Sequence, residues 1–142
     1  MKIYFAGSIR GGRNDVYVYN KIINHLKNYG DVLTEHVGSD SLTSTGENSL
    51  NDVQIHDRDI EWLKSSDIII AEVTNPSLGV GYEIAMALNL NKKVICLYKT
   101  QKDKRLSAMI SGNKKIRVIK YLDVKNLLIE IDKLLSISND SI

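Results

Sequence analysis

The sequence contains one cysteine, one proline and no long run of apolar residues. A single cysteine excludes a disulfide within the chain, which is typical of proteins from reducing compartments. Because no apolar stretch reaches about 18 residues, the sequence predicts no membrane-spanning helix. We also expect no signal peptide, since no basic segment followed by a short apolar run precedes the first strand pattern. We therefore expect a cytoplasmic protein, without excluding the nucleus.

A strong net charge is also absent. The 19 basic and 17 acidic residues leave a formal charge of +2, which is too small to indicate nucleic-acid binding by bulk electrostatics. Histidine, cysteine and acidic residues do not cluster at metal-ligand spacing, so we expect neither a metal nor another cofactor. The 142 residues are 43% hydrophobic and are sufficient for a single domain, 1–142, with a buried core.

Five short apolar runs alternate with helical patterns along the chain. The runs cover 3–6, 32–34, 68–73, 94–98 and 116–120, and the helical patterns cover 16–29, 55–65, 79–91 and 124–136. Two of the runs, 68–73 and 94–98, are almost continuously apolar, as strands buried on both faces of a parallel sheet are.

This alternation predicts an α/β fold. We expect one doubly wound, Rossmann-like (flavodoxin-like) domain with a five-stranded, mainly parallel sheet flanked by helices and the strand order 2-1-3-4-5. The polar segment 38–51 is expected to be a loop and 136–142 a frayed tail. Sheets of this kind bind ligands beyond the carboxyl ends of strands next to the first strand.

The first strand-to-helix turn, 7–13, has the composition of an anion site. Its glycines allow close backbone approach, Ser8 supplies a hydroxyl group, and Arg10 and Arg13 supply guanidinium donors. The turn matches neither the dinucleotide fingerprint nor a Walker loop. Phosphate binding and a plain glycine-rich surface turn are therefore both open at this point.

A second turn, within 71–83, leads into a helix that carries an acid. Asn75 or Ser77 can cap this helix, Gly79 lies in its first turn, and Glu83 follows. We expect Glu83 in the first turn, where the helix dipole keeps a carboxylate ionised. The alternative is a glutamate that only stabilises its helix.

A second acid lies on the apolar side of the preceding helix. A helical wheel of 55–66 places Asp59 within the arc of Ile55, Trp62 and Leu63. Desolvation there would raise its pKa, as a general acid requires, although a buried aspartate can also simply cap backbone groups. The other charged residues of the helix lie outside the arc: Asp57, Arg58, Glu61 and Lys64.

Together the two acids predict a contrasted pair, with Glu83 ionised and Asp59 protonated. Such pairs cleave glycosidic bonds, and a separation near ~5 Å favours a covalent, retaining route. Tyr4 on the first strand can hydrogen-bond a carboxylate or a sugar, or be a core aromatic. His36 follows the second strand and can line a base pocket, or be a structural histidine.

Five segments in order along the chain resemble one enzyme family. They are 4–13 (YFAGSIRGGR), 32–37 (VLTEHV), 59–63 (DIEWL), 71–83 (AEVTNPSLGVGYE) and 106–110 (LSAMI). With these segments the chain resembles the nucleoside 2-deoxyribosyltransferase superfamily, and most of all its 2′-deoxynucleoside 5′-monophosphate N-hydrolases (N-glycosidases). The resemblance implies hydrolysis of the N-glycosidic bond to deoxyribose 5-phosphate and a free base.

The resemblance also assigns roles to residues. It implies that Glu83 is the nucleophile at C1′, that Asp59 assists base departure and that Tyr4 orients Glu83. It further implies that a serine of a neighbouring subunit, here Ser107 with Met109 beside it, completes the phosphate site of a homodimer. The residues expected to hold sugar and phosphate within one chain are Gly7, Ser8, Ile9, Arg10, Gly11, Ser77 and Gly79.

Three other functions stay open at this stage. The related transferases exchange bases between nucleosides that lack the 5′-phosphate, and other relatives hydrolyse ribonucleotides such as cytidine monophosphate. The serines at 8, 77 and 107 together with Arg10 favour the phosphate-dependent branch, and Tyr4 favours deoxy substrates. A nucleotide sensor without catalytic activity is the alternative from a different functional class.

Overall fold

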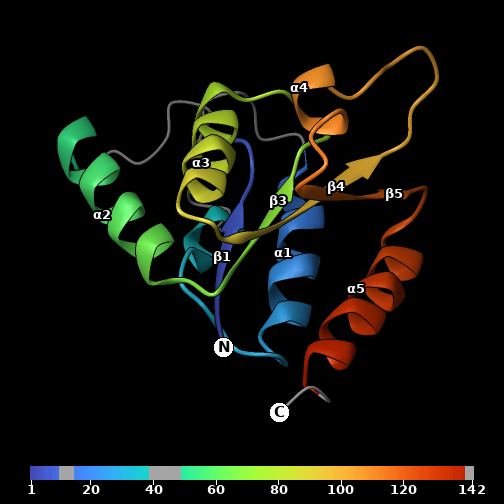
Figure 1. Cartoon of the computed structure of the whole chain (residues 1–142), viewed down its shortest axis with the longest axis horizontal. Coiled ribbons are helices and arrows are strands. Elements are labelled where there is room, and N and C mark those ends of the chain that lie inside the picture. The colour runs from blue at the N-terminus through green and yellow to red at the C-terminus, as the bar shows by residue number, and fades with distance from the viewer. Residues whose placement is uncertain (10–14, 39–48, 140–142) are drawn as a thin grey trace.

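The computed structural model describes residues 1–9, 15–38 and 49–139. At its centre lies a five-stranded sheet in the order β2-β1-β3-β4-β5 with every neighbouring pair parallel (Figure 1). The strands are β1 (Lys2–Ala6), β2 (Asp31–Val32), β3 (Ile68–Glu72), β4 (Lys93–Lys99) and β5 (Ile116–Tyr121). The expected fold class and strand order are confirmed, and the sheet is parallel throughout rather than mainly parallel.

Helices cover both faces of the sheet. On one face, α1 (Val16–Leu26) and α5 (Val124–Asn139) pack on alternate side chains of β1, β3, β4 and β5. On the other face, α2 (Asp52–Ser65) and α3 (Leu78–Asn89) cover the remaining side chains of β1, β3 and β4 (Figure 1). The short elements η1 (Glu35–Gly38) and α4 (Ala108–Ser111) follow β2 and β4. Two apolar cores therefore sandwich the sheet, as the doubly wound pattern predicts.

Strand β2 is shorter than the expected run 32–34, because a side chain takes over its pairing. The hydroxyl group of buried Thr34 accepts a hydrogen bond from the Phe5 N–H at 2.8 Å and donates one to the Phe5 carbonyl oxygen at 2.6 Å. The chain can then leave the sheet edge with the backbone groups of Phe5 still paired. It continues into η1, which carries His36.

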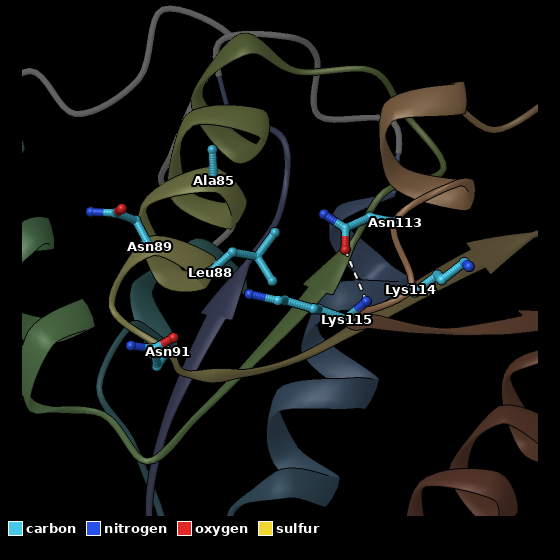
Figure 2. A pocket seen from close by; sticks show the side chains of 7 residues that line it. All are labelled: Ala85, Leu88, Asn89, Asn91, Asn113, Lys114 and Lys115. Atoms are coloured by element: carbon cyan, nitrogen blue, oxygen red, sulfur yellow. Dashed lines mark hydrogen bonds between the residues drawn. The ribbon is translucent and has the colours of Figure 1, made fainter.

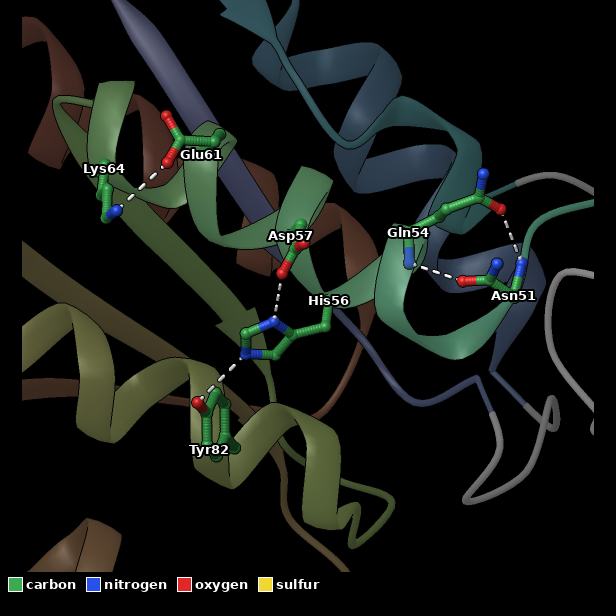
Figure 3. A network of polar contacts seen from close by, with 7 residues as sticks. All are labelled: Asn51, Gln54, His56, Asp57, Glu61, Lys64 and Tyr82. Atoms are coloured by element: carbon green, nitrogen blue, oxygen red, sulfur yellow. Dashed lines mark hydrogen bonds and ion pairs between the residues drawn. The ribbon is translucent and has the colours of Figure 1, made fainter.

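Helix α2 begins before the expected residue 55. Its N-terminus is a capping box, in which the Asn51 side chain accepts from the Gln54 N–H and the Gln54 side chain accepts from the Asn51 N–H (Figure 3). Of the expected loop 38–51, residues 39–48 lie outside the described part of the chain.

The last helix extends further than expected. Helix α5 continues to Asn139, so the segment after 136 starts as helix, and 140–142 lie outside the described residues. None of the helices in the described ranges combines the length and the apolar composition that a bilayer crossing demands.

Candidate active site

A cavity of about 650 Å³ opens between α2 and α3, beyond the carboxyl ends of β1 and β3. This is the strand-order switch of the sheet, where the fold is expected to bind ligands. Four elements contribute to it, namely the segment after β1, η1, α2 and the first part of α3. The cavity brings together seven of the residues expected to form the site: Gly7, Ile9, His36, Asp59, Ser77, Gly79 and Glu83.

The other expected residues lie below, beside or outside this cavity. Tyr4 is buried beneath it in β1, and Ser8 is buried with its N–H donating to the Tyr19 hydroxyl at 3.0 Å. Arg10 and Gly11 fall outside the described residues.

The Glu83 carboxyl group is held in an environment that disfavours its charge. Burial, and secondly the negative charge of Asp59, raise its pKa from 4.5 to about 8, while a hydrogen bond from Tyr4 lowers it. The expectation that Glu83 is kept ionised by the helix terminus is therefore wrong. Helix α3 begins at Leu78, with the Ser77 hydroxyl accepting from the Val80 N–H, so Glu83 lies beyond the first turn. The helix dipole acts mainly within that first turn.

Tyr4 is a neutral hydrogen-bond donor beneath the two acids. Its pKa is raised above the ordinary value by burial and by the negative charges of Glu83 and Asp59. A tyrosine in this state keeps its proton across the working range of most enzymes. It can therefore orient Glu83 without competing for the role of acid.

Asp59 faces the cavity, but not in the apolar surroundings expected from the helical wheel. Its Oδ1 atom accepts hydrogen bonds from Nε of Arg58 at 3.0 Å and from Nη2 at 2.8 Å. The two side chains are 20% and 25% exposed, so this ion pair is largely removed from solvent. We expected Asp59 in apolar surroundings and Glu83 in charged form. The structure reverses these settings, because Glu83 is the desolvated acid and Asp59 is the acid in an ion pair.

Arg58 is a site residue that the sequence analysis missed. The wheel placed it outside the apolar arc, yet it lines the cavity and its guanidinium group lies 4.6 Å from the Trp62 ring centroid. A helical wheel places only the start of a side chain, and arginine is long enough to fold back over the residue one turn away. The i, i+4 spacing of Arg58 and Trp62 in the sequence could have indicated this contact.

The mouth of the cavity is bridged by exposed side chains of α2 and α3. Nδ1 of His56 lies 2.9 Å from Oδ1 of its neighbour Asp57 on α2, and Nε2 lies 3.3 Å from the hydroxyl oxygen of Tyr82 on α3. Figure 3 shows the histidine ring between these two side chains. No role was predicted for these residues. His56 and Tyr82 line the cavity and are exposed, so both can be reached by a ligand.

The start of α3 leaves room for an anion. A Cβ atom added at Gly79 would meet only the Ser77 Oγ atom, at 3.8 Å. The space next to this helix N-terminus is therefore open to the cavity, and N–H groups at such a terminus attract phosphate.

A second cavity of about 430 Å³ adjoins the first. It lies between α3 and α4 and is lined by Ser107, Met109 and Arg105 among others. Pro76, Ser77 and Val80 line both cavities. Ser107 and Met109 are thus placed beside the main cavity of their own chain and not among its lining residues.

Glu72, at the end of β3, is a buried acid to which the sequence assigned no role. It is fully buried, and it accepts hydrogen bonds from the Thr74 N–H at 2.6 Å, the Thr74 hydroxyl at 3.0 Å and the Tyr121 hydroxyl. The Thr74 hydroxyl in turn accepts from the Lys99 N–H at 2.8 Å. Burial raises the Glu72 pKa. These bonds join the ends of three strands directly before the turn that carries Ser77.

A third depression lies at the far end of α3 and carries none of the expected site residues. Figure 2 shows its lining: Ala85, Leu88, Asn89, Asn91, Asn113, Lys114 and Lys115. Its described lining contains no carboxyl group, so it lacks the pair of acids that glycosidic cleavage uses. Across the described ranges, no group of three or more histidine, cysteine or acidic side chains could hold a metal ion.

Comparison with known proteins places the chain in a family. The model of the family described as nucleoside 2-deoxyribosyltransferase matches residues 3–127. The chain belongs to this family. The membership that the sequence motifs indicated is thereby confirmed.

Two relatives are named 5-hydroxymethyl-dUMP N-hydrolase. The Danio rerio protein is 57% identical over 112 residues, which cover 79% of this chain and 78% of that protein. The Homo sapiens protein is 50% identical over 111 residues, which cover 78% of this chain and 64% of that protein. Their names agree with the enzyme class expected from the sequence.

The fold is also that of a solved enzyme structure. The Clostridium botulinum CMP N-glycosidase BcmB superposes with a TM-score of 0.70 at 20% identity, covering 94% of this chain and 99% of that one. At this identity the likeness supports the shared fold and says nothing about the substrate.

We predict that Glu83→Gln stabilises the protein in a pH-dependent manner. The folded-state pKa of about 8 exceeds the ordinary value of 4.5, so the wild type loses stability as the pH rises between these two values. Above about pH 8 the glutamine variant should unfold with a free energy higher by on the order of 1 kcal/mol or more, and near pH 4 the two should be equal. Urea unfolding at both pH values measures this difference.

The matched control is Glu61→Gln on the exposed side of α2, where the glutamate pairs only with Lys64 (Figure 3). This control should show little change at either pH. Equal stability of Glu83→Gln and wild type above pH 8 would contradict the buried setting of Glu83.

Proposed function

We propose that this chain hydrolyses the N-glycosidic bond of 2′-deoxynucleoside 5′-monophosphates and releases deoxyribose 5-phosphate and a free base. The supporting observation is that Glu83 and Asp59 line one cavity, close enough for the charge of Asp59 to raise the pKa of Glu83. Two carboxyl groups that flank one reacting carbon are the basic requirement for this reaction. The relatives named 5-hydroxymethyl-dUMP N-hydrolase support a deoxynucleotide substrate.

In the proposed reaction Glu83 is the nucleophile. Its carboxylate attacks C1′, the bond from C1′ to the base nitrogen breaks, and a covalent glycosyl-enzyme forms. Asp59 gives a proton to the departing base, and then accepts one from the water molecule that cleaves the glycosyl–enzyme bond. Tyr4 holds the Glu83 carboxylate towards C1′ through its hydrogen bond.

The protonation of the two acids has to change before this reaction can start. With a pKa of about 8, Glu83 is mostly protonated at neutral pH, whereas Asp59 is ion-paired with Arg58. Attack requires the reverse, a charged Glu83 and a proton available on Asp59. We infer that the two acids share one proton as a coupled pair and that the bound substrate favours the arrangement with the proton on Asp59.

The remaining cavity wall fits the two ends of a nucleotide. Ser77 and the open space at Gly79 lie on the side expected to hold the phosphate, and buried Ser8 lies between the lining residues Gly7 and Ile9 in the sequence. Arg10 and Gly11 complete this side in the proposal. At the base end, His36 lies 5.6 Å from the Trp62 ring centroid, next to Arg58. Aromatic and guanidinium faces of this kind stack on bases, and we propose 5-hydroxymethyl-dUMP as one substrate.

We also propose that the enzyme acts as a homodimer in which Ser107 of one subunit completes the phosphate site of the other. Three apolar side chains support a covered surface near the cavities: Leu78 is 97% exposed, Met109 81% and Tyr82 51%. Leu78 and Tyr82 are one helical turn apart and line the main cavity, and Met109 lines the adjoining one together with Ser107. Exposed apolar side chains of this size are typical of interfaces when they form a patch.

The central test is release of base from nucleotides. We expect the wild type to release free base from 5-hydroxymethyl-dUMP or from one of the four common deoxynucleoside monophosphates. Glu83→Gln should reduce this turnover by at least about 1000-fold, because no covalent intermediate can form. Chromatography of the base measures both. Binding of nucleotides without any turnover would instead identify a sensor and refute the proposal.

Further assay arms separate the related enzymes. Exchange of a free base into unphosphorylated deoxynucleosides would identify a transferase, and turnover of cytidine monophosphate in preference to deoxynucleotides would identify a ribonucleotide hydrolase.

We predict opposite pH shifts for two neighbours of Glu83. The wild-type kcat/KM should fall as the pH rises through about 8, because the pair then loses the one proton that Asp59 must give to the base. Tyr4→Phe removes the bond that lowers the Glu83 pKa, so this limb should move to higher pH. Asp59→Asn removes both the acid and the charge that raises the Glu83 pKa, so its low remaining rate should instead rise with pH, with a midpoint below 8. If the pH midpoint of kcat/KM is the same in both variants as in the wild type, Glu83 is not the group that titrates.

We predict that Ser107→Ala and Glu83→Gln complement each other when mixed. If Ser107 acts in the neighbouring subunit, each mixed dimer contains one site with neither change, and random mixing restores about a quarter of the wild-type sites. Turnover of a phosphorylated substrate before and after co-refolding measures this. Ser107→Ala alone should weaken phosphorylated substrates selectively. No gain on mixing would place Ser107 in its own chain's site or outside the site altogether.

A further inference from the structure

Arg58 makes contacts that go beyond an ordinary surface ion pair. Nε and Nη2 both donate to Oδ1 of Asp59, at 3.0 and 2.8 Å. In the described part of the chain, Oδ2 of Asp59 takes part in neither of these bonds. Two donors on one oxygen fix the rotation of the carboxyl group, and they leave the second oxygen for another partner.

The guanidinium group is itself fixed on α2. It lies 4.6 Å from the centroid of Trp62, which is one helical turn further along. An arginine stacked on an indole ring loses little further freedom when it forms hydrogen bonds. Trp62 packs partly buried against the core beneath α2 and α3, so the anchor does not move with solvent-exposed side chains.

The same group reaches a second element. Nη2 of Arg58 donates to Nε2 of His36 in η1 at 3.3 Å, and His36 also lies against Trp62 with ring centroids 5.6 Å apart. Because a guanidinium group only donates, Nε2 of His36 is the acceptor in this bond. One side chain thus connects the acid on α2 to the histidine after β2, at the base end of the cavity.

We propose that Arg58 is a positioning residue for base departure, which aims Oδ2 of Asp59 at the leaving base and holds His36 as the facing wall. This inference rests on the proposed function. Arg58 acts through Asp59, so its contribution appears only where the departing base needs a proton. A base whose anion is already stable leaves without that help.

The test uses the leaving-group dependence of the rate. Wild type, Arg58→Gln and Arg58→Lys are assayed on dUMP analogues that carry 5-hydroxymethyl, 5-fluoro or 5-nitro groups, in order of increasing stability of the base anion. With the hydroxymethyl substrate, kcat should fall by about 10- to 100-fold in Arg58→Gln. With the nitro substrate the loss should be less than about 3-fold. Lysine should rescue little, because it lacks the planar fork.

Two controls separate positioning from stability. Lys64→Gln removes a positive charge from the exposed side of the same helix, where Lys64 pairs with Glu61, and should leave all three rates unchanged (Figure 3). In an Asp59→Asn background, Arg58→Gln should cost less than about 3-fold with every substrate, since the partner it positions is already lost.

The outcomes are distinguishable. An equal loss across the three substrates, or a full additional loss in the Asp59→Asn background, would overturn the role of Arg58. Thermal melts show whether Arg58→Gln is folded, and Arg58→Lys answers the same question if it is not. Absence of turnover in the wild type with every nucleotide would instead overturn the proposed function itself.

Discussion

The desolvation of one half-buried carboxyl group governs this site. Glu83 accepts a hydrogen bond from Tyr4 and feels the charge of Asp59, in a cavity wall where burial raises its pKa to about 8. A folded protein tolerates such a group only if the surrounding structure is stable enough to hold it. Here that structure is the parallel sheet, which supplies Tyr4 from a buried strand, and the two helices that cover the same face.

Among the described residues, a cation pairs with one of the two acids and a neutral donor serves the other. Arg58 neutralises Asp59 on the base side, and the neutral donor Tyr4 serves Glu83 from below. A cation lies beside Asp59, whereas burial and the charge of Asp59 raise the pKa of Glu83. In the proposed reaction, the charge of the nucleotide phosphate becomes part of the electrostatic balance that decides which acid carries the proton.

The sequence predicted the fold better than the electrostatics. Continuous apolar runs such as 68–73 identify buried parallel strands, and their alternation with helices leaves few topologies open. The start of α2 was predicted too late, at 55, although Asn51 and Gln54 have the spacing of a capping box. The ionisation of Glu83 was predicted wrongly because it depends on where α3 begins. The role of Arg58 was missed because it depends on where a long side chain ends. The position of Ser107 in the proposed site depends on a second subunit, which no pattern within one chain can place.

The turn at 76–80 is a wall common to both cavities. An occupant of either cavity therefore lies against residues that also line the other. If one occupant changes the affinity for the other, thermodynamic linkage requires the same factor in the reverse direction. In the proposed homodimer, a partner side chain in the second cavity would link nucleotide binding to subunit assembly, and the apparent affinity for the nucleotide would then vary with protein concentration.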